Sequence, residues 1–142
     1  MLKTFWEKVG SKVDIMEAEK HDYILSITSH MPHLIAYNIV NTTLNVQDKK
    51  ETDVIKYSAG GLRDFTRIAA SNPIMWRDVF IQNKKNTSHM IDNFIANLED
   101  LKKAIENEDG KKLEEIFAKT KKIRKEIVKA GQDVNKPDFG RK

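Results

Sequence analysis

Residues 91–127 read IDNFIANLEDLKKAIENEDGKKLEEIFAKTKKIRKEI, and this pattern predicts two helices joined by a tight turn. In each half, the residues of the predicted inner face recur at alternating spacings of three and four, which places them on one side of a helix. They are Ile91, Phe94, Leu98, Leu101 and Ile105 in the first half, and Leu113, Ile116, Thr120, Ile123 and Ile127 in the second. Asp109-Gly110 interrupts the pattern, and Asp109 is suited to cap the second helix. We therefore expect an antiparallel helical hairpin whose apolar faces meet each other or a partner.

A long helix is predicted upstream, from Glu17 to Val46. Its apolar residues again keep spacings of three and four, and they are Ile24, Ile27, Met31, Leu34, Ile35 and Ile39. Pro32 lies inside this run, and a proline removes one backbone hydrogen bond and clashes with the preceding turn. We expect a kink near Thr28 for that reason. The polar segment from Gln47 to Thr52 is predicted to be a loop.

Two shorter helical regions follow this loop. The first runs from Val54 to Ala70 and is interrupted by Gly60-Gly61. Each glycine weakens a helix by about 1 kcal/mol relative to alanine, so a new helix is expected to start at this pair. Asn72 is a favourable N-cap and Pro73 suits the first helical position, which predicts a third helix from there to about Asn83.

The two ends of the chain differ from this helical middle. Residues 2–9 are predicted to form a short helix that ends at Gly10, and residues 12–16 alternate as KVDIM, which is typical of a brief strand. A strand this short needs a neighbour to pair with, and the rest of the chain offers none. Residues 131–142 contain Pro137 and Gly140 and are predicted to be an extended tail. The expected fold class is all-α, with the helical domain over residues 17–130.

The composition excludes several classes of protein. With 142 residues, 39% hydrophobic and 32% charged, the chain is expected to be one soluble folded domain. It has no cysteine, which excludes disulfides and a thiol nucleophile and fits a reducing, cytoplasmic location. No stretch approaches the roughly 20 apolar residues that span a bilayer, and the N-terminus does not read as a signal peptide, so no membrane partner is expected.

The net charge of +4 does not predict binding to nucleic acid. The excess of basic residues lies mostly between Lys102 and Lys129, where glutamates are interspersed. Mixed charges on an amphipathic helix are typical of a solvated face.

A cluster of polar residues on the long helix is the first candidate site. His30 and His33 are three residues apart and so share a face, with Ser26 and Ser29 one turn earlier. Four polar groups beside a proline are unusual in a simple core helix, and such departures often mark functional sites. One interpretation is a pocket that hydrogen-bonds an oxygen-rich ligand, and the other is a pair of structural histidines. A zinc site would need further ligands, and we expect no metal here.

The second candidate is Arg67, at the end of the segment GGLRDFTR over residues 60–67. Its neighbours Phe65, Ile68, Ala69 and Ala70 are apolar, and the planar guanidinium matches a carboxylate in a two-point contact. The alternative is an internal ion pair between Arg67 and Asp64, three residues earlier. Ser71 and Trp76 follow one and about two turns later.

Motifs for nucleotide binding and for catalysis are absent from the sequence. It has no Gly-x-Gly-x-x-Gly after a strand and no Gly-x-x-x-x-Gly-Lys-Ser/Thr, so no phosphate cradle is predicted. Neither a Ser-His-Asp order nor a paired-carboxylate site is evident. We therefore predict no catalytic, cofactor-binding or metal-binding residue in this chain.

Four segments together resemble the C-terminal domain of the prephenate dehydrogenases, a family that includes arogenate and cyclohexadienyl dehydrogenases of tyrosine biosynthesis. They are HD at 21–22, SHMPH at 29–33, AGGLRDFTRIA at 59–69 and NPIMWRD at 72–78. The resemblance extends from about Phe5 to the end of the helical hairpin, and the order and spacing of the segments make it specific. Met31 stands where leucine is more usual and Leu62 where phenylalanine is more usual.

The resemblance implies an oxidative decarboxylation of prephenate or arogenate with hydride transfer to NAD or NADP. In this family an N-terminal Rossmann domain holds the cofactor and a catalytic histidine, and the helical domain closes the cleft and forms the dimer. Residues 1–16 would then be the remnant of that nucleotide-binding domain, and this chain would bind no cofactor itself.

The resemblance also implies roles for the candidate residues. Arg67 matches the arginine that binds a substrate carboxylate, and His30 and His33 match histidines of the same pocket, with His33 nearer the ligand. Asp64, Ser71 and Trp76 match positions associated with the pocket and its gating. The substrate-binding set expected here is Arg67, His33, His30, Ser26, Ser29, Asp64, Ser71 and Trp76.

The leading hypothesis is thus a partial dehydrogenase that is a homodimer, binds a small carboxylate and is inactive without its nucleotide-binding domain. An alternative is a stand-alone, non-catalytic module that binds an aromatic acid such as tyrosine. A third is a purely structural helical dimer.

Overall fold

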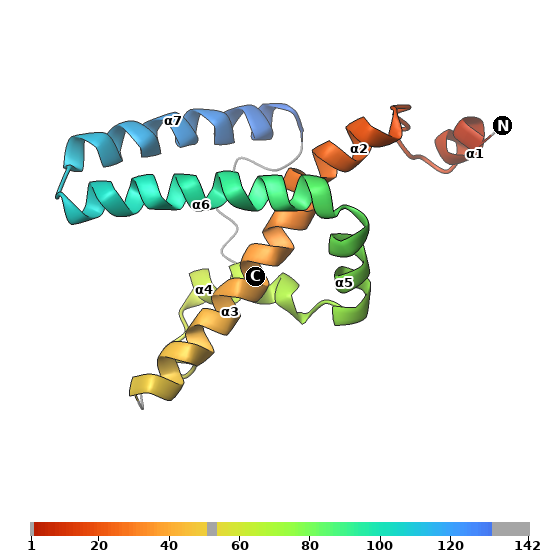
Figure 1. The fold of residues 1–142 in the computed structure, drawn as a ribbon. Coiled ribbons are helices and arrows are strands. Elements are labelled where there is room, and N and C mark those ends of the chain that lie inside the picture. Colours follow the sequence, from red (N-terminus) through yellow and green to blue (C-terminus); the bar gives the residue numbers. More distant parts are fainter. Residues whose placement is uncertain (1, 51–53, 132–142) are drawn as a thin grey trace.

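The computed structural model describes residues 2–50 and 54–131, and every regular element in them is helical (Figure 1). In chain order the elements are α1 (Leu2–Lys8), α2 (Ala18–Leu25), the π-helical turn η1 (Ser26–His30), α3 (Met31–Lys50), α4 (Gly60–Thr66), the 3₁₀ turn η2 (Arg67–Ala70), α5 (Pro73–Gln82), α6 (Lys84–Glu106) and α7 (Gly110–Lys129). The all-α prediction is confirmed for this part of the chain.

The C-terminal hairpin is the one predicted. Helices α6 and α7 lie side by side and run in opposite directions (Figure 1). Asp109 caps α7, because its carboxylate accepts a hydrogen bond of 3.0 Å from the backbone N–H of Lys112. Glu108 allows the tight reversal by adopting a positive φ of 51°. Asn72 likewise caps α5, where its side-chain oxygen accepts from the N–H groups of Ile74 and Met75.

Helices α2 and α3 form one long rod that is interrupted where the sequence predicts a kink. The interruption is η1, in which the backbone N–H of Met31 bonds to the carbonyl of Ser26. Pro32 has no N–H to give to the carbonyl of Thr28, so the hydrogen-bond ladder changes here, and it does so through a single π turn. The rod continues to Lys50, so the loop predicted from Gln47 begins too early. Residues 51–53 lie outside the described residues.

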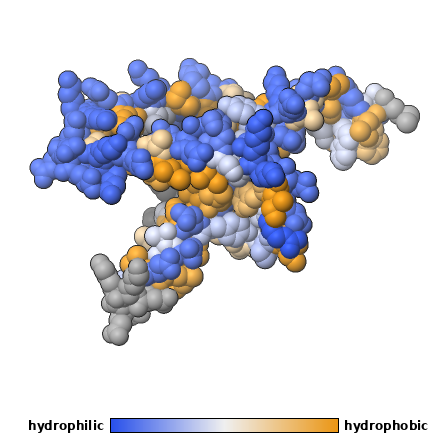
Figure 2. Space-filling view, in the orientation of Figure 1, coloured by the Kyte–Doolittle hydropathy of each residue, from blue (hydrophilic) through white to orange (hydrophobic). Residues whose placement is uncertain are grey.

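The helices cross rather than form a closed bundle. The start of α6 packs on η1, η2 packs on α3, and α5 packs on α6 (Figure 1). The buried apolar residues are few and are Met31, Ala36, Trp76, Met90 and Ala104. Large apolar side chains stay exposed on α6 and α7, among them Leu98, Ile105 and Phe117. Figure 2 shows apolar surface gathered beneath α6 in this view.

Two further sequence predictions are wrong in detail. Residues 12–16 form no strand, and no strand occurs anywhere in the described ranges, so KVDIM has no partner for its backbone. The segment before Gly60 is a turn rather than helix, and the helix starts at the glycine pair. The predicted extended tail lies outside the described residues, apart from Gly131. No helix in the part of the chain that the structure describes is long and apolar enough to cross a membrane.

Candidate functional site

His33 is oriented by its own helix. Its Nδ1 lies 3.0 Å from the backbone carbonyl oxygen of Ser29, one turn earlier. A carbonyl oxygen only accepts, so Nδ1 carries the hydrogen and donates it. The neutral ring therefore has a free lone pair on Nε2.

The indole of Trp76 forms one wall of the site. It stacks on His33 with ring centroids 3.7 Å apart and an interplanar angle of 23°. Trp76 is only 7% exposed, and its Nε1 has no hydrogen-bond acceptor among the described residues. His30 meets the same indole edge-on at 6.3 Å, and Phe80 lies 5.5 Å from it. A buried donor without an acceptor is unfavourable by about 1–3 kcal/mol, so this N–H is a local cost to stability.

Tyr37 fixes the segment that carries Arg67 against α3. Its hydroxyl donates a 2.8 Å hydrogen bond to the backbone oxygen of Ser71. Tyr37 lies one turn beyond His33, so the two side chains share a face of α3. The hydroxyl of Ser71 donates to the carbonyl of Ile68 at 2.7 Å, which closes the 3₁₀ turn. The face of α3 that bears His33 is therefore next to the turn that begins at Arg67.

Arg67 itself is exposed and forms no ion pair with any described residue. The alternative pairing with Asp64 is not formed, because the carboxylate of Asp64 faces Nε of Arg63 at 3.5 Å. Both members of that pair are largely exposed, so it is weak. The guanidinium of Arg67 is free to meet an anion from outside the chain.

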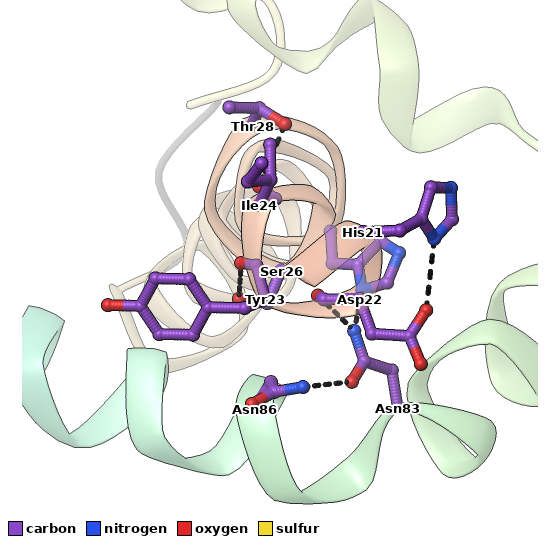
Figure 3. Close-up of polar contacts among 9 residues, drawn as sticks. His21, Asp22, Tyr23, Ile24, Ser26, Thr28, Asn83 and Asn86 are labelled. Carbon is purple, nitrogen blue, oxygen red and sulfur yellow. Dashed lines mark hydrogen bonds and ion pairs between the residues drawn. The ribbon is translucent and has the colours of Figure 1, made fainter. Parts of the chain in front are cut away.

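The remaining polar candidates are used within the helix. Ser26 is fully buried, and its hydroxyl donates to the carbonyl of Tyr23 at 2.6 Å (Figure 3). Ser29 contributes its carbonyl oxygen to His33. The structure thus brings together His33, His30 and Trp76, while the Ser71 backbone contacts Tyr37 and the side chains of Arg67 and Asp64 are exposed.

His30 lies deeper than His33 and is only 7% exposed. Burial lowers its pKa below the ordinary value, and the nearby His21 and His33 lower it further, while Asp22 acts in the opposite direction. At neutral pH the ring is uncharged, so it can act as both donor and acceptor.

The chain matches the family model described as the dimerization domain of prephenate dehydrogenase over residues 17–119. The chain belongs to this family. It corresponds to the C-terminal dimerization domain.

Curated relatives of the family extend the match. The chain is 41% identical to the cyclohexadienyl dehydrogenase of Zymomonas mobilis over 84% of its own length and 41% of that protein. It is 36% identical to the prephenate dehydrogenase of Bacillus subtilis, over 77% of this chain and 29% of the relative. The chain spans less than half the length of these relatives.

Solved structures of family members share the fold. The prephenate dehydrogenase of Aquifex aeolicus, in complex with hydroxyphenyl propionate and NAD⁺, superposes with a TM-score of 0.82 at 43% identity, over 89% of this chain and 44% of that one. The arogenate dehydrogenase of Synechocystis has a TM-score of 0.76 at 20% identity, over 88% of this chain and 45% of that one, which is a likeness of fold.

Three residues of the site were not singled out from the sequence. Tyr37 and Phe80 each lie one helical turn beyond a predicted site residue, and that spacing could have indicated them. Asn83 ends the predicted third helix, and no local signal points to its contact with His30, in which Nδ2 of Asn83 lies 3.3 Å from Nδ1 of His30. Among the described residues, no group of three or more potential metal ligands lies close enough to hold a metal ion.

Proposed function

We propose that this chain is the substrate-binding and dimer-forming part of a prephenate or arogenate dehydrogenase, and that it binds the carboxylate of an aromatic-type acid. One observation supports this proposal most directly. His33 stacks on Trp76, and Tyr37, one turn further along α3, holds the turn that begins at Arg67. The Aquifex aeolicus relative, which is complexed with a hydroxyphenyl carboxylic acid, supports the choice of ligand.

Each group has a distinct task in this proposal. The guanidinium of Arg67 makes a two-point contact with the carboxylate, which a fork of parallel N–H donors suits. The Nε2 lone pair of His33 accepts from a ligand hydroxyl. The indole of Trp76 stacks on His33 and so holds its imidazole in place.

The residues of this chain do not fit a dinucleotide. The described helices offer no glycine-rich turn after a strand, and no strand is present in residues 2–50 or 54–131. We propose that the hydride acceptor is held outside the helices described here. We propose that the 142-residue chain binds the acid but does not oxidise prephenate with NAD⁺ or NADP⁺.

The dimer is proposed to form through the apolar faces left uncovered on α6 and α7. Leu98 and Ile105 of α6 and Ile123 and Ile127 of α7 belong to the predicted hairpin faces, yet all four are exposed in the single chain. Such a row of apolar side chains favours a second copy of the chain as its cover.

Titration calorimetry with 4-hydroxyphenylpropionate tests the binding site. We expect binding by the 142-residue chain and a loss of at least about tenfold in affinity in Arg67→Ala, since a charge-assisted contact contributes about 1.5–3 kcal/mol. Arg77→Ala is the matched control, because Arg77 is an exposed arginine paired only with Asp78. Equal affinity of Arg67→Ala and the wild type would refute the site.

A further inference from the structure

Asn83 joins three parts of the chain that are distant in sequence. It lies at the junction of α5 and α6 and is 8% exposed. Its side-chain Nδ2 is 2.7 Å from the backbone oxygen of Asp22 and 3.3 Å from Nδ1 of His30. Figure 3 shows the amide of Asn83 between Asp22 and Asn86, whose own amide donates to Oδ1 of Asn83 at 2.9 Å.

These contacts determine the orientation of the side-chain amide of Asn83. The oxygen of Asp22 is a backbone carbonyl and can only accept, so the NH₂ group of Asn83 must face it. One of its two hydrogens goes to Asp22 and the other is directed to Nδ1 of His30. Nδ1 must then present a lone pair, and the hydrogen of the neutral imidazole is on Nε2.

The two histidines consequently have opposite tautomers. His33 donates from Nδ1 to the Ser29 carbonyl and so keeps a lone pair on Nε2. His30 accepts at Nδ1 from Asn83 and so keeps a hydrogen on Nε2. The two imidazoles together offer one hydrogen-bond acceptor and one hydrogen-bond donor. A ligand hydroxyl can bond to either of them, and an acid oxygen can accept from the donor.

We propose that Asn83 is a positioning residue that holds His30 in the Nε2–H tautomer, so that the candidate site has a fixed hydrogen-bond donor beside the acceptor of His33. It acts through His30. The role in ligand binding rests on the function proposed above, whereas the tautomer itself does not.

The tautomers can be measured without any ligand. In two-bond ¹H–¹⁵N correlation spectra of the wild-type chain at about pH 7.5, we expect the Nε2–H form for His30 and the Nδ1–H form for His33. A wild-type spectrum with His30 in the Nδ1–H form overturns the proposal, and this measurement needs no variant to fold.

Asn83→Asp reverses the polarity of the contact. A carboxylate accepts, so we expect His30 to move to the Nδ1–H form and its pKa to rise by about 1 unit or more, since an opposite charge now lies close to the ring. Asn83→Ala removes the donor, and we expect a mixture of tautomers. Asn93→Asp is the matched control, because it adds the same charge at an exposed position of α6 whose contact is with His89 rather than with Asn83 or His30. An unchanged His30 spectrum in a folded Asn83→Ala or Asn83→Asp chain overturns the proposal.

Affinity provides the second readout. We expect Asn83→Ala to weaken binding of 4-hydroxyphenylpropionate by up to about tenfold, because the donor on His30 is no longer fixed. If the wild type binds no acid, the proposed function fails, and the tautomer spectra alone decide the role of Asn83.

Discussion

The indole of Trp76 lies flat against the imidazole of His33, with ring centroids 3.7 Å apart. The first residue belongs to α5 and the second to α3, so the stack joins two helices from separate parts of the chain. Trp76 is also one of the few buried apolar residues. The same side chain therefore supports the fold and forms a wall of the candidate site.

Replacing Trp76 should weaken both fold and site. We expect Trp76→Ala to lower the free energy of unfolding by about 3 kcal/mol, as is typical when a buried aromatic side chain is removed. Trp76→Phe should lose less, because a ring can still stack on His33. Urea titrations followed by circular dichroism measure the change. Trp6→Ala is the control, since Trp6 is half exposed, and an effect as large as that of Trp76→Ala would contradict the assignment.

The hydrogen bond from Tyr37 to Ser71 should stabilise the turn that carries Arg67. We expect Tyr37→Phe to reduce the free energy of unfolding by about 0.5–1.5 kcal/mol, the net contribution of one hydrogen bond. Amide exchange measured by mass spectrometry should become faster in residues 67–71. Tyr57→Phe serves for comparison, because Tyr57 is 75% exposed, and it should change neither quantity.

Stability should depend on the protonation of His30. Its pKa in the folded chain is lowered by burial from the ordinary value of 6.5, so the unfolded chain binds the proton more readily. The free energy of unfolding is therefore fully retained above about pH 6.5 and falls as the pH drops from there through the folded pKa. Urea unfolding between about pH 7.5 and pH 5 measures this slope. The dependence of stability on pH should become weaker in His30→Gln. It should persist in His89→Gln, because the imidazole of His89 is exposed. A pH dependence that is lost in His89→Gln but kept in His30→Gln would contradict the assignment to His30.

The exposed apolar face of α6 should be needed for self-association. Leu98 is 48% exposed and Ile105 is 62% exposed in the single chain. We expect Leu98→Asp to shift the chain from dimer to monomer in sedimentation equilibrium, because a buried unpaired carboxylate strongly opposes association. Lys103→Gln tests the same change of one charge unit at an exposed position of the same helix. If Leu98→Asp remains as dimeric as the wild type, the interface does not include this face of α6.

The irregularity near Thr28 could be predicted from the residues themselves, because it follows from Pro32. The stack of His33 on Trp76 and the edge contact of His30 with it are seen in the structure, while the binding role of these residues stays a prediction. The role of Arg67 stays a prediction, because its side chain is exposed and no hydrogen bond or ion pair joins it to a described residue. The short strand was wrong because alternation alone does not supply a pairing partner.

The sequence by itself determined the helices, their caps and the hairpin, because these depend on side chains three or four residues apart. It also determined the family, through motifs in a fixed order. Only the tertiary structure decided the contacts of Asn83 with His30 and of Tyr37 with Ser71, which join residues 53 and 34 positions apart. Such contacts depend on how whole helices cross, and the crossing of two helices cannot be predicted from a local pattern of residues.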